Sequence, residues 1–98
     1  MSESFDINLC TQRLCKEFVS CNVIGAKVAT NGYQGGDSGH GSRTYFCLDW
    51  DESTDIDVRV SDNKIEIMLG GDCELKTFND ALKWSSDTLS SMTQNPWE

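Results

Sequence analysis

The sequence predicts a two-layer α+β sandwich, in which a four-stranded antiparallel meander carries two helices on one face. Two observations predict this fold. Apolar residues recur with a helical period near both ends of the chain, and they alternate with polar residues through its middle. Strict alternation over successive segments is typical of an antiparallel sheet with one face on a core and the other in water. The expected order of elements is therefore αββββα.

The first predicted helix covers residues 5–21. At 100° per residue, its apolar side chains fall on one stripe, and the charged side chains lie off it. The stripe consists of Ile7, Cys10, Leu14, Phe18 and Cys21.

The period then changes to two, which predicts strands. Residues 24–29 form the first strand, and Asn31-Gly32 follows as a turn dipeptide because both residues tolerate positive φ. The next strands cover residues 44–50, 55–61 and 64–69, with Asp62-Asn63 as a two-residue hairpin turn between the last two. All four strands place their apolar side chains on the same side, as a continuous meander requires.

A final helix is predicted from one apolar stripe near the C-terminus. The stripe consists of Leu75, Phe78, Leu82, Leu89 and Met92. Thr77 with Asp80 resembles a capping box at the start of this helix. Residues 1–98 are expected to form a single domain, with residues 93–98 as a flexible tail because Asn95-Pro96 does not continue a helix.

Composition excludes several classes of function. Sixteen Asp and Glu against eight Lys and Arg give a net charge of −8, which argues against binding nucleic acid or a membrane by bulk charge. No apolar run approaches the ~20 residues that cross a bilayer. The first residues lack the pattern of a signal peptide, so a cytoplasmic protein is expected.

The five cysteines indicate neither a disulfide framework nor a zinc site. They are odd in number and form no C-x-x-C pair, and the chain has a single His. We therefore expect five reduced, structural thiols, no metal site and no cofactor.

The glycine-rich loop of residues 31–43 is longer than a hairpin needs, and it admits three interpretations. It is an irregular loop, a binding site for an anion, or the catalytic loop of a hydrolase that uses Ser38 and His40. Convergent backbone N–H groups and nearby side chains form the candidate site for a nucleotide or phosphate. Its residues are Gly35, Gly36, Asp37, Ser38, Gly39, His40, Gly41 and Arg43. The hydrolase is the weakest interpretation, because Ser38 and His40 have no orienting third group.

The polar face of the predicted sheet and the stray aromatic residues Tyr33, Trp84 and Trp97 are candidates for protein recognition. Carboxylates on this face suit a basic partner, and exposed aromatic side chains are frequent in protein interfaces. The candidate partner-binding residues are Tyr33, Tyr45, Asp49, Asp57, Arg59, Glu66 and Trp84. Trp84 belongs to this set because it lies about 160° from the Leu82 stripe at the helical period. A homodimer is also compatible with this face.

The segment Tyr33-Gln34-Gly35-Gly36-Asp37-Ser38-Gly39-His40-Gly41, followed by a predicted strand, resembles segments of small uncharacterised proteins of bacteriophages and prophages. The resemblance covers nine residues and implies no activity or site residues. The size and acidity of the chain are similar to those of phage-encoded inhibitors of host defence, including anti-CRISPR proteins. This similarity of type favours a binding protein over an enzyme. Together with the net charge of −8, the mixed polar sheet face and the stray aromatic residues, it leads us to expect a non-catalytic inhibitor that binds and occludes a larger host protein in the host cytoplasm. The alternative is sequestration of a small anion by the glycine-rich loop.

Overall fold

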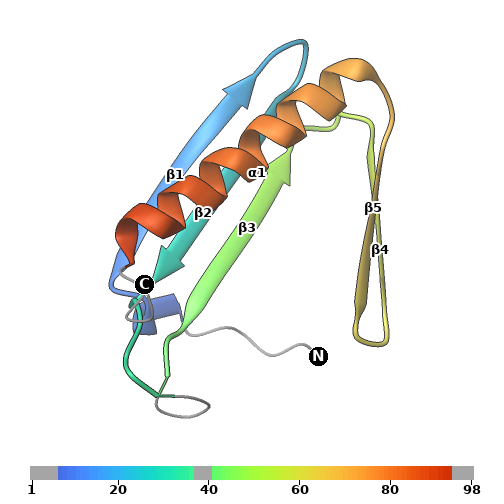
Figure 1. Cartoon of the computed structure of the whole chain (residues 1–98). Coiled ribbons are helices and arrows are strands. Elements are labelled where there is room, and N and C mark those ends of the chain that lie inside the picture. The colour runs from blue at the N-terminus through green and yellow to red at the C-terminus, as the bar shows by residue number, and fades with distance from the viewer. Residues whose placement is uncertain (1–6, 37–40, 94–98) are drawn as a thin grey trace.

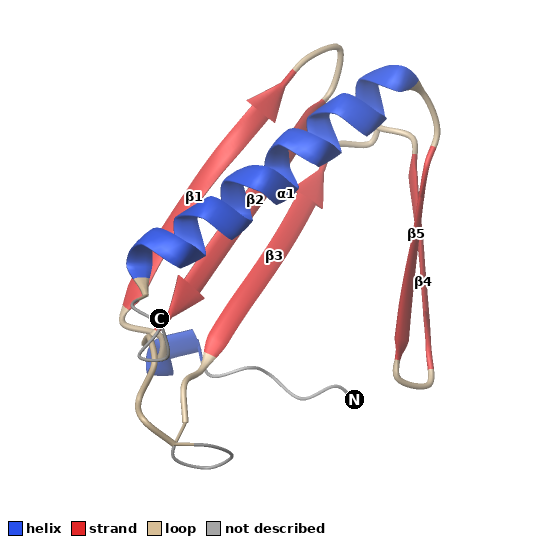
Figure 2. Ribbon diagram, in the orientation of Figure 1, coloured by secondary structure: helices blue, strands red, loops and turns tan. Residues whose placement is uncertain are grey.

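The computed structural model describes residues 7–36 and 41–93. These residues form one α-helix and five strands, and the strands make up two sheets (Figures 1 and 2). The elements are η1 (Ile7–Leu9), β1 (Gln12–Val19), β2 (Val23–Thr30), β3 (Thr44–Trp50), β4 (Ile56–Ser61), β5 (Lys64–Leu69) and α1 (Asp72–Met92). The strands β1-β2-β3 form an antiparallel sheet, and β4-β5 form a separate hairpin. The predicted αββββα order and the single four-stranded meander are therefore wrong.

The first predicted helix is wrong because residues 12–19 form strand β1. This strand pairs with β2 along its whole length, from Gln12 opposite Thr30 to Val19 opposite Val23. Leu14 and Phe18 are four residues apart, a spacing that puts two side chains on one face of either a helix or a strand. The apolar stripe was therefore ambiguous, and tertiary pairing with β2 decides between the two structures.

The core lies between α1 and the middle of the three-stranded sheet. Strand β2 is the central strand, and its Ile24, Ala26 and Val28 are buried on the side that α1 covers. Ile24 and Ala26 pack with Ala81 of α1 to form the central cluster. Phe18, Leu48, Ile56, Phe78 and Trp84 pack around this cluster. Figure 1 shows α1 lying along one face of the sheet, across β1 and β2.

Helix α1 begins five residues earlier than the predicted capping box. Its N-cap is Gly71, whose φ of 118° favours glycine, and no side chain caps the helix there. Thr77 lies in the second turn, where its hydroxyl donates to the Cys73 carbonyl at 2.8 Å. Since Thr77 lies within the helix, where its side chain is buried, and not at the N-cap, the predicted capping box is wrong.

The face of α1 that contacts the sheet consists of small residues, and it is not the predicted apolar stripe. The buried side chains are Thr77, Ala81, Ser85 and Thr88. Leu82 of the predicted stripe is one residue, or about 100° of helix rotation, from buried Ala81, and it remains exposed. Small side chains let the helix approach the sheet, while the large ones extend to its side.

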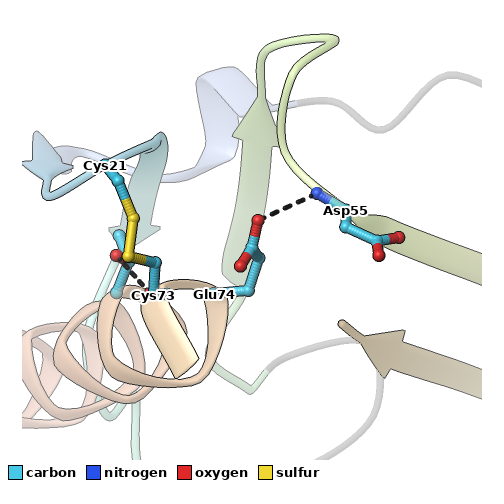
Figure 3. Close-up of a disulfide and its surroundings, with 5 residues drawn as sticks. Cys21, Asp55, Cys73 and Glu74 are labelled. Atoms are coloured by element: carbon cyan, nitrogen blue, oxygen red, sulfur yellow. Dashed lines mark hydrogen bonds between the residues drawn. A yellow bond between two sulfur atoms is a disulfide. The ribbon is translucent and has the colours of Figure 1, made fainter. Parts of the chain in front are cut away.

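A disulfide joins two segments that are far apart in the sequence. Cys21, in the turn between β1 and β2, is bonded to Cys73 in the first turn of α1 (Figure 3). The Cα atoms are 6.1 Å apart. The expectation of five reduced thiols is therefore wrong for this pair, whereas Cys10, Cys15 and Cys47 are free. The bond fixes the start of α1 to the end of the sheet.

Candidate protein-binding surface

The hairpin β4–β5 forms as the sequence predicts, with Asp62 and Asn63 at its turn. Asn63 adopts φ of 56°, a conformation that Asn tolerates better than most residues. The register places Val58 opposite Ile67 and Val60 opposite Ile65. Because side chains alternate between faces, one face of the hairpin is apolar and the other is polar. On the polar face, Arg59 and Glu66 form an ion pair at 3.6 Å.

The apolar face of the hairpin is exposed, although its alternation predicts burial. Val60 is 71% exposed and Ile65 is 69% exposed, and Val58 and Ile67 are also exposed. Figure 1 shows the reason: the hairpin stands apart from β3, so no sheet continues through it. Only its base reaches the core, where Ile56 packs against the central cluster. Such a patch on a small protein is typical of an interaction surface.

Backbone hydrogen bonds fix the base of the hairpin next to the start of α1. The Gly70 N–H donates to the Asp55 carbonyl at 3.0 Å. The Asp55 N–H donates to Oε2 of Glu74 at 3.2 Å, as Figure 3 shows. This donated bond is the main reason that the pKa of Glu74 is lowered from its ordinary value. The hairpin therefore leaves the body of the protein at a defined place.

The link between β3 and β4 is an ordered turn rather than a loose connection. The Asp51 carboxylate accepts hydrogen bonds from the Ser53 hydroxyl at 2.7 Å and the Thr54 hydroxyl at 3.0 Å. These bonds lower the pKa of Asp51, with the Ser53 hydroxyl as the largest cause. The Thr54 N–H also donates to the Asp51 carbonyl at 3.1 Å. The turn thus gives the connection between β3 and β4 a defined shape.

Negative charge is concentrated in the link and the hairpin. Residues 49–66, which we call the acidic arm, contain seven Asp and Glu and two Lys and Arg. The arm therefore carries a net charge of −5 out of −8 for the whole chain. The charge is local: Asp49 lies at the end of β3, Asp51, Glu52 and Asp55 lie in the link, and the hairpin itself carries a net −1.

A second apolar surface lies beside the hairpin, between α1 and β3. Trp84 contacts Phe18 of β1 edge to face, with ring centroids 6.0 Å apart, so this side of α1 faces β1. Leu89, on the opposite side of the helix, lines a cavity together with Thr44 of β3. The exposed leucines of the same stripe therefore lie on the β3 side. We define the α1–β3 surface by its exposed residues Phe46, Trp50, Leu75 and Leu82.

The structure does not gather the seven predicted partner-binding residues into one patch. Tyr45 and Asp49 lie on the sheet face opposite α1, as predicted. Asp57, Arg59 and Glu66 lie on the polar face of the hairpin, which belongs to a different sheet. Tyr33 is exposed in the glycine-rich loop, at the other end of the molecule. Trp84 packs beside the core and is only partly exposed.

On the open face of the three-stranded sheet, polar side chains surround a shallow hollow of about 420 Å³. The Asp49 carboxylate covers the backbone of Gly25, and the Lys27 ammonium lies 5.9 Å from the centroid of the Tyr45 ring. A hydrogen bond with Cys47 is the main reason that the pKa of Tyr45 is raised. This face is mixed in charge, which does not favour one class of ligand.

The glycine-rich loop lies near the end of α1, and its base is closed by hydrogen bonds. The Arg43 N–H donates to Oδ1 of Asn31 at 2.7 Å, and the Asn31 N–H donates to the Arg43 carbonyl at 3.2 Å. The Arg43 guanidinium donates to the carbonyls of Gly41 and Ser42 within its own loop. Gly35 adopts φ of 80° and Gly36 follows it. Four residues of the predicted anion site and hydrolase, Asp37, Ser38, Gly39 and His40, lie outside the described residues.

Beneath this loop is a cavity of about 180 Å³ without charged walls. It is lined by Thr30, Gly32, Tyr33, Ser42, Thr44, Leu89 and Thr93. Two of its hydroxyls, those of Thr30 and Thr44, already share a hydrogen bond at 3.1 Å, and the Gly32 N–H donates to the Thr30 hydroxyl. The cavity therefore does not indicate a site for a charged anion.

Residues 7–36 and 41–93 contain no group of three or more His, Cys, Asp or Glu side chains that could hold a metal ion. No helix within these residues has the length and apolar character needed to cross a membrane.

Three features of the surface were not predicted from the sequence. They are the disulfide, the rotation of α1 and the separation of the hairpin from β3. The charge cluster of residues 49–52 and 55–57 was the one signal that pointed to the arm.

No protein-family model, curated protein or solved structure matched the chain.

Proposed function

We propose that the protein is a non-catalytic binding domain that uses its acidic arm to bind and occlude a larger protein with a basic surface. The observation that carries the proposal is the placement of charge: a net −5 lies on residues 49–66, which run from the end of β3 through the link into the projecting hairpin. A basic partner is attracted to such an arm over a distance of about 10 Å at moderate ionic strength.

The shape of the arm supports binding to a protein rather than to a small molecule. A hairpin that stands away from the body presents its polar face, with Asp57 and Glu66, to the surface of a partner. The closed base of the glycine-rich loop offers no comparable support for the anion alternative.

The test is retention of partners by two charge variants that remove the same charge from different places. Asp57→Asn with Asp62→Asn removes two negative charges from the arm. Asp80→Asn with Asp87→Asn removes two from the exposed surface of α1, where each carboxylate pairs with a lysine four residues earlier. Such surface pairs contribute little to stability, so both variants should fold.

Immobilised protein is exposed to a cell lysate at low and at raised salt. We expect basic proteins to be captured at low salt, to be lost progressively with salt, and to be retained by the α1 variant but not by the arm variant. Equal retention by the two variants, or capture of acidic proteins alone, would contradict the proposal.

A further inference from the structure

Two apolar surfaces of this chain remain exposed. One is the apolar face of the hairpin, consisting of Val58, Val60, Ile65 and Ile67. The other is the α1–β3 surface of Phe46, Trp50, Leu75 and Leu82. Ile56, which starts the apolar face of β4, packs against the central cluster, as do Leu48 and Phe78. Exposed apolar side chains that gather in this way are typical of interaction surfaces.

Each surface also lacks what normally stabilises it. A two-stranded hairpin in water is marginally stable unless a helix or another strand covers it. Strand β3 pairs only with β2, so its other edge has no partner among the described strands. An uncovered edge beside an apolar face readily accepts another strand. Each surface would therefore be stabilised by covering the other.

The hairpin stands apart from the α1–β3 surface of its own chain, and hydrogen bonds fix its base (Figure 1). The Gly70 N–H donates to the Asp55 carbonyl, and the Asp55 N–H donates to the Glu74 carboxylate, so both ends of the hairpin are held at the start of α1. The turn at Asp51 fixes the link that precedes the hairpin. Moving the hairpin onto β3 would break these hydrogen bonds and withdraw Ile56 from the core. A second copy can supply its hairpin without breaking any of them.

We propose that two copies form a two-fold symmetric dimer, in which the hairpin β4–β5 of each copy covers the α1–β3 surface of the other. The exchange is reciprocal, so the assembly closes at two copies and leaves neither surface exposed. Covering most of the exposed area of the eight side chains in both copies buries on the order of 1,000 Å², which is the size at which specific interfaces become stable. The proposal does not rest on the proposed function, because it uses the apolar face of the arm and leaves its charged groups outside.

The charge of the chain gives this dimer a distinctive salt dependence. The eight side chains of the two surfaces are all uncharged, so no ion pair needs to form across the interface. Each copy carries −8, and the two copies therefore repel each other at low salt. Added salt screens the repulsion and leaves apolar burial intact. The dimer should tighten as ionic strength rises, opposite to the binding of a basic partner.

The experiment compares two lysine variants by size-exclusion chromatography with light scattering over a range of concentrations. Val60→Lys places a charge on the apolar face of the hairpin. Met68→Lys is its matched control, because Met68 is 70% exposed against 71% for Val60 but lies on the opposite face. We expect the unaltered protein to reach twice the 10.9-kDa chain mass. We expect Met68→Lys to do the same, and Val60→Lys to dimerise on the order of 100-fold more weakly because it buries an unpaired charge.

A third variant tests the other half of the contact. Leu82→Lys changes α1 at a site that is 41% exposed, so it should fold and yet lose the dimer. A mixture of Val60→Lys with Leu82→Lys should regain part of the dimer, since one of its two hairpin contacts has no altered residue. Circular dichroism checks the fold of each variant, and a non-reducing denaturing gel should show only monomer, which excludes intermolecular disulfides.

Several results would overturn the proposal. One is a single 10.9-kDa species of the unaltered protein at every concentration and salt. Equal loss of the dimer in Met68→Lys and Val60→Lys would show that the face of the hairpin does not matter. A dimer that survives Leu82→Lys would show that the hairpins contact each other instead. Dimerisation that weakens with salt would indicate contacts between charges.

Discussion

Gly25 of β2 and Asp49 of β3 lie directly opposite each other in the sheet, so a change at one position affects the other. A Cβ atom on Gly25 would lie 2.5 Å from Oδ1 of Asp49, so Gly25→Ala requires this carboxylate to move. Alanine is otherwise favoured over glycine in a strand by about 0.5–1 kcal/mol. We therefore expect Gly25→Ala to give no gain in the free energy of unfolding, but to stabilise the Asp49→Ala variant by about that amount.

Urea denaturation of the four proteins in this cycle measures the coupling. The coupling prediction fails if Gly25→Ala has the same effect with and without the Asp49 side chain.

The carboxylates of Asp51 and Glu74 give stability a defined dependence on pH. Hydrogen bonds in the folded state lower the pKa of both groups, so the folded protein holds these protons less tightly than the unfolded chain. Their contribution is present above the ordinary pKa of about 4 and is lost as the pH falls through the lowered values. We expect Asp51→Asn with Glu74→Gln to flatten the acid limb of the stability curve.

Urea midpoints between neutral and acidic pH provide the measurement. Asp62→Asn with Asp57→Asn, which removes equal charge from the hairpin, is the control. A double variant of Asp51 and Glu74 whose midpoint falls on acidification as steeply as that of the control would contradict this interpretation.

The disulfide acts at the scale of elements, because it joins the β1–β2 turn to the start of α1. It closes a loop of 52 residues, which lowers the entropy of the unfolded chain. The chain-entropy relation gives up to about 4 kcal/mol of stabilisation for a loop of this length. We expect Cys21→Ser with Cys73→Ser to lower the free energy of unfolding by an amount up to this value.

Reductant separates this effect from the loss of two side chains. It should destabilise the unaltered protein and the Cys15→Ser control, whose thiol is free and exposed, but not the double variant. An unaltered protein that is equally stable with and without reductant would show that the bond contributes nothing.

The elements that the sequence predicted well are those specified by local signals. The alternation in residues 24–29, 44–50, 55–61 and 64–69 placed β2 to β5, and Asp62-Asn63 placed the hairpin turn. The elements that failed depend on distant contacts. Leu14 and Phe18 are four residues apart, which is compatible with the period of a helix and with that of a strand, and only pairing with β2 makes this segment a strand. Cysteine pairing likewise cannot be deduced from spacing.

The candidate site was predicted only in part, and the reason is again tertiary. Shared parity among four strands predicts one polar face, but parity does not show that consecutive strands pair. The turn at Asp51 separates β4 from β3, so residues expected on one face lie on two sheets. The acidic composition of the arm was visible in the sequence, whereas its projection from the body was not.

At the scale of the whole molecule, the arm makes the protein extended and its stability uneven. The radius of gyration is 15.2 Å, against about 13 Å for a compact domain of this length. The central cluster joins β2 to α1, while the hairpin touches the core only through its base. Regions with few buried apolar contacts open locally at low free energy. We therefore expect amides of β4 and β5 to exchange hydrogen much faster than those of β2 in dilute solution.

Hydrogen exchange followed at two concentrations tests this prediction and connects it to the proposed dimer. Amides of β2 should exchange only by global unfolding, so added urea should accelerate them with the full slope of the unfolding transition. Amides of the hairpin should show little such dependence when dilute, and should become protected as the concentration rises, because a second copy then covers them. Met68→Lys should gain this protection and Val60→Lys should not. Hairpin amides that match β2 in dilute protein would mean that the arm belongs to the cooperative core.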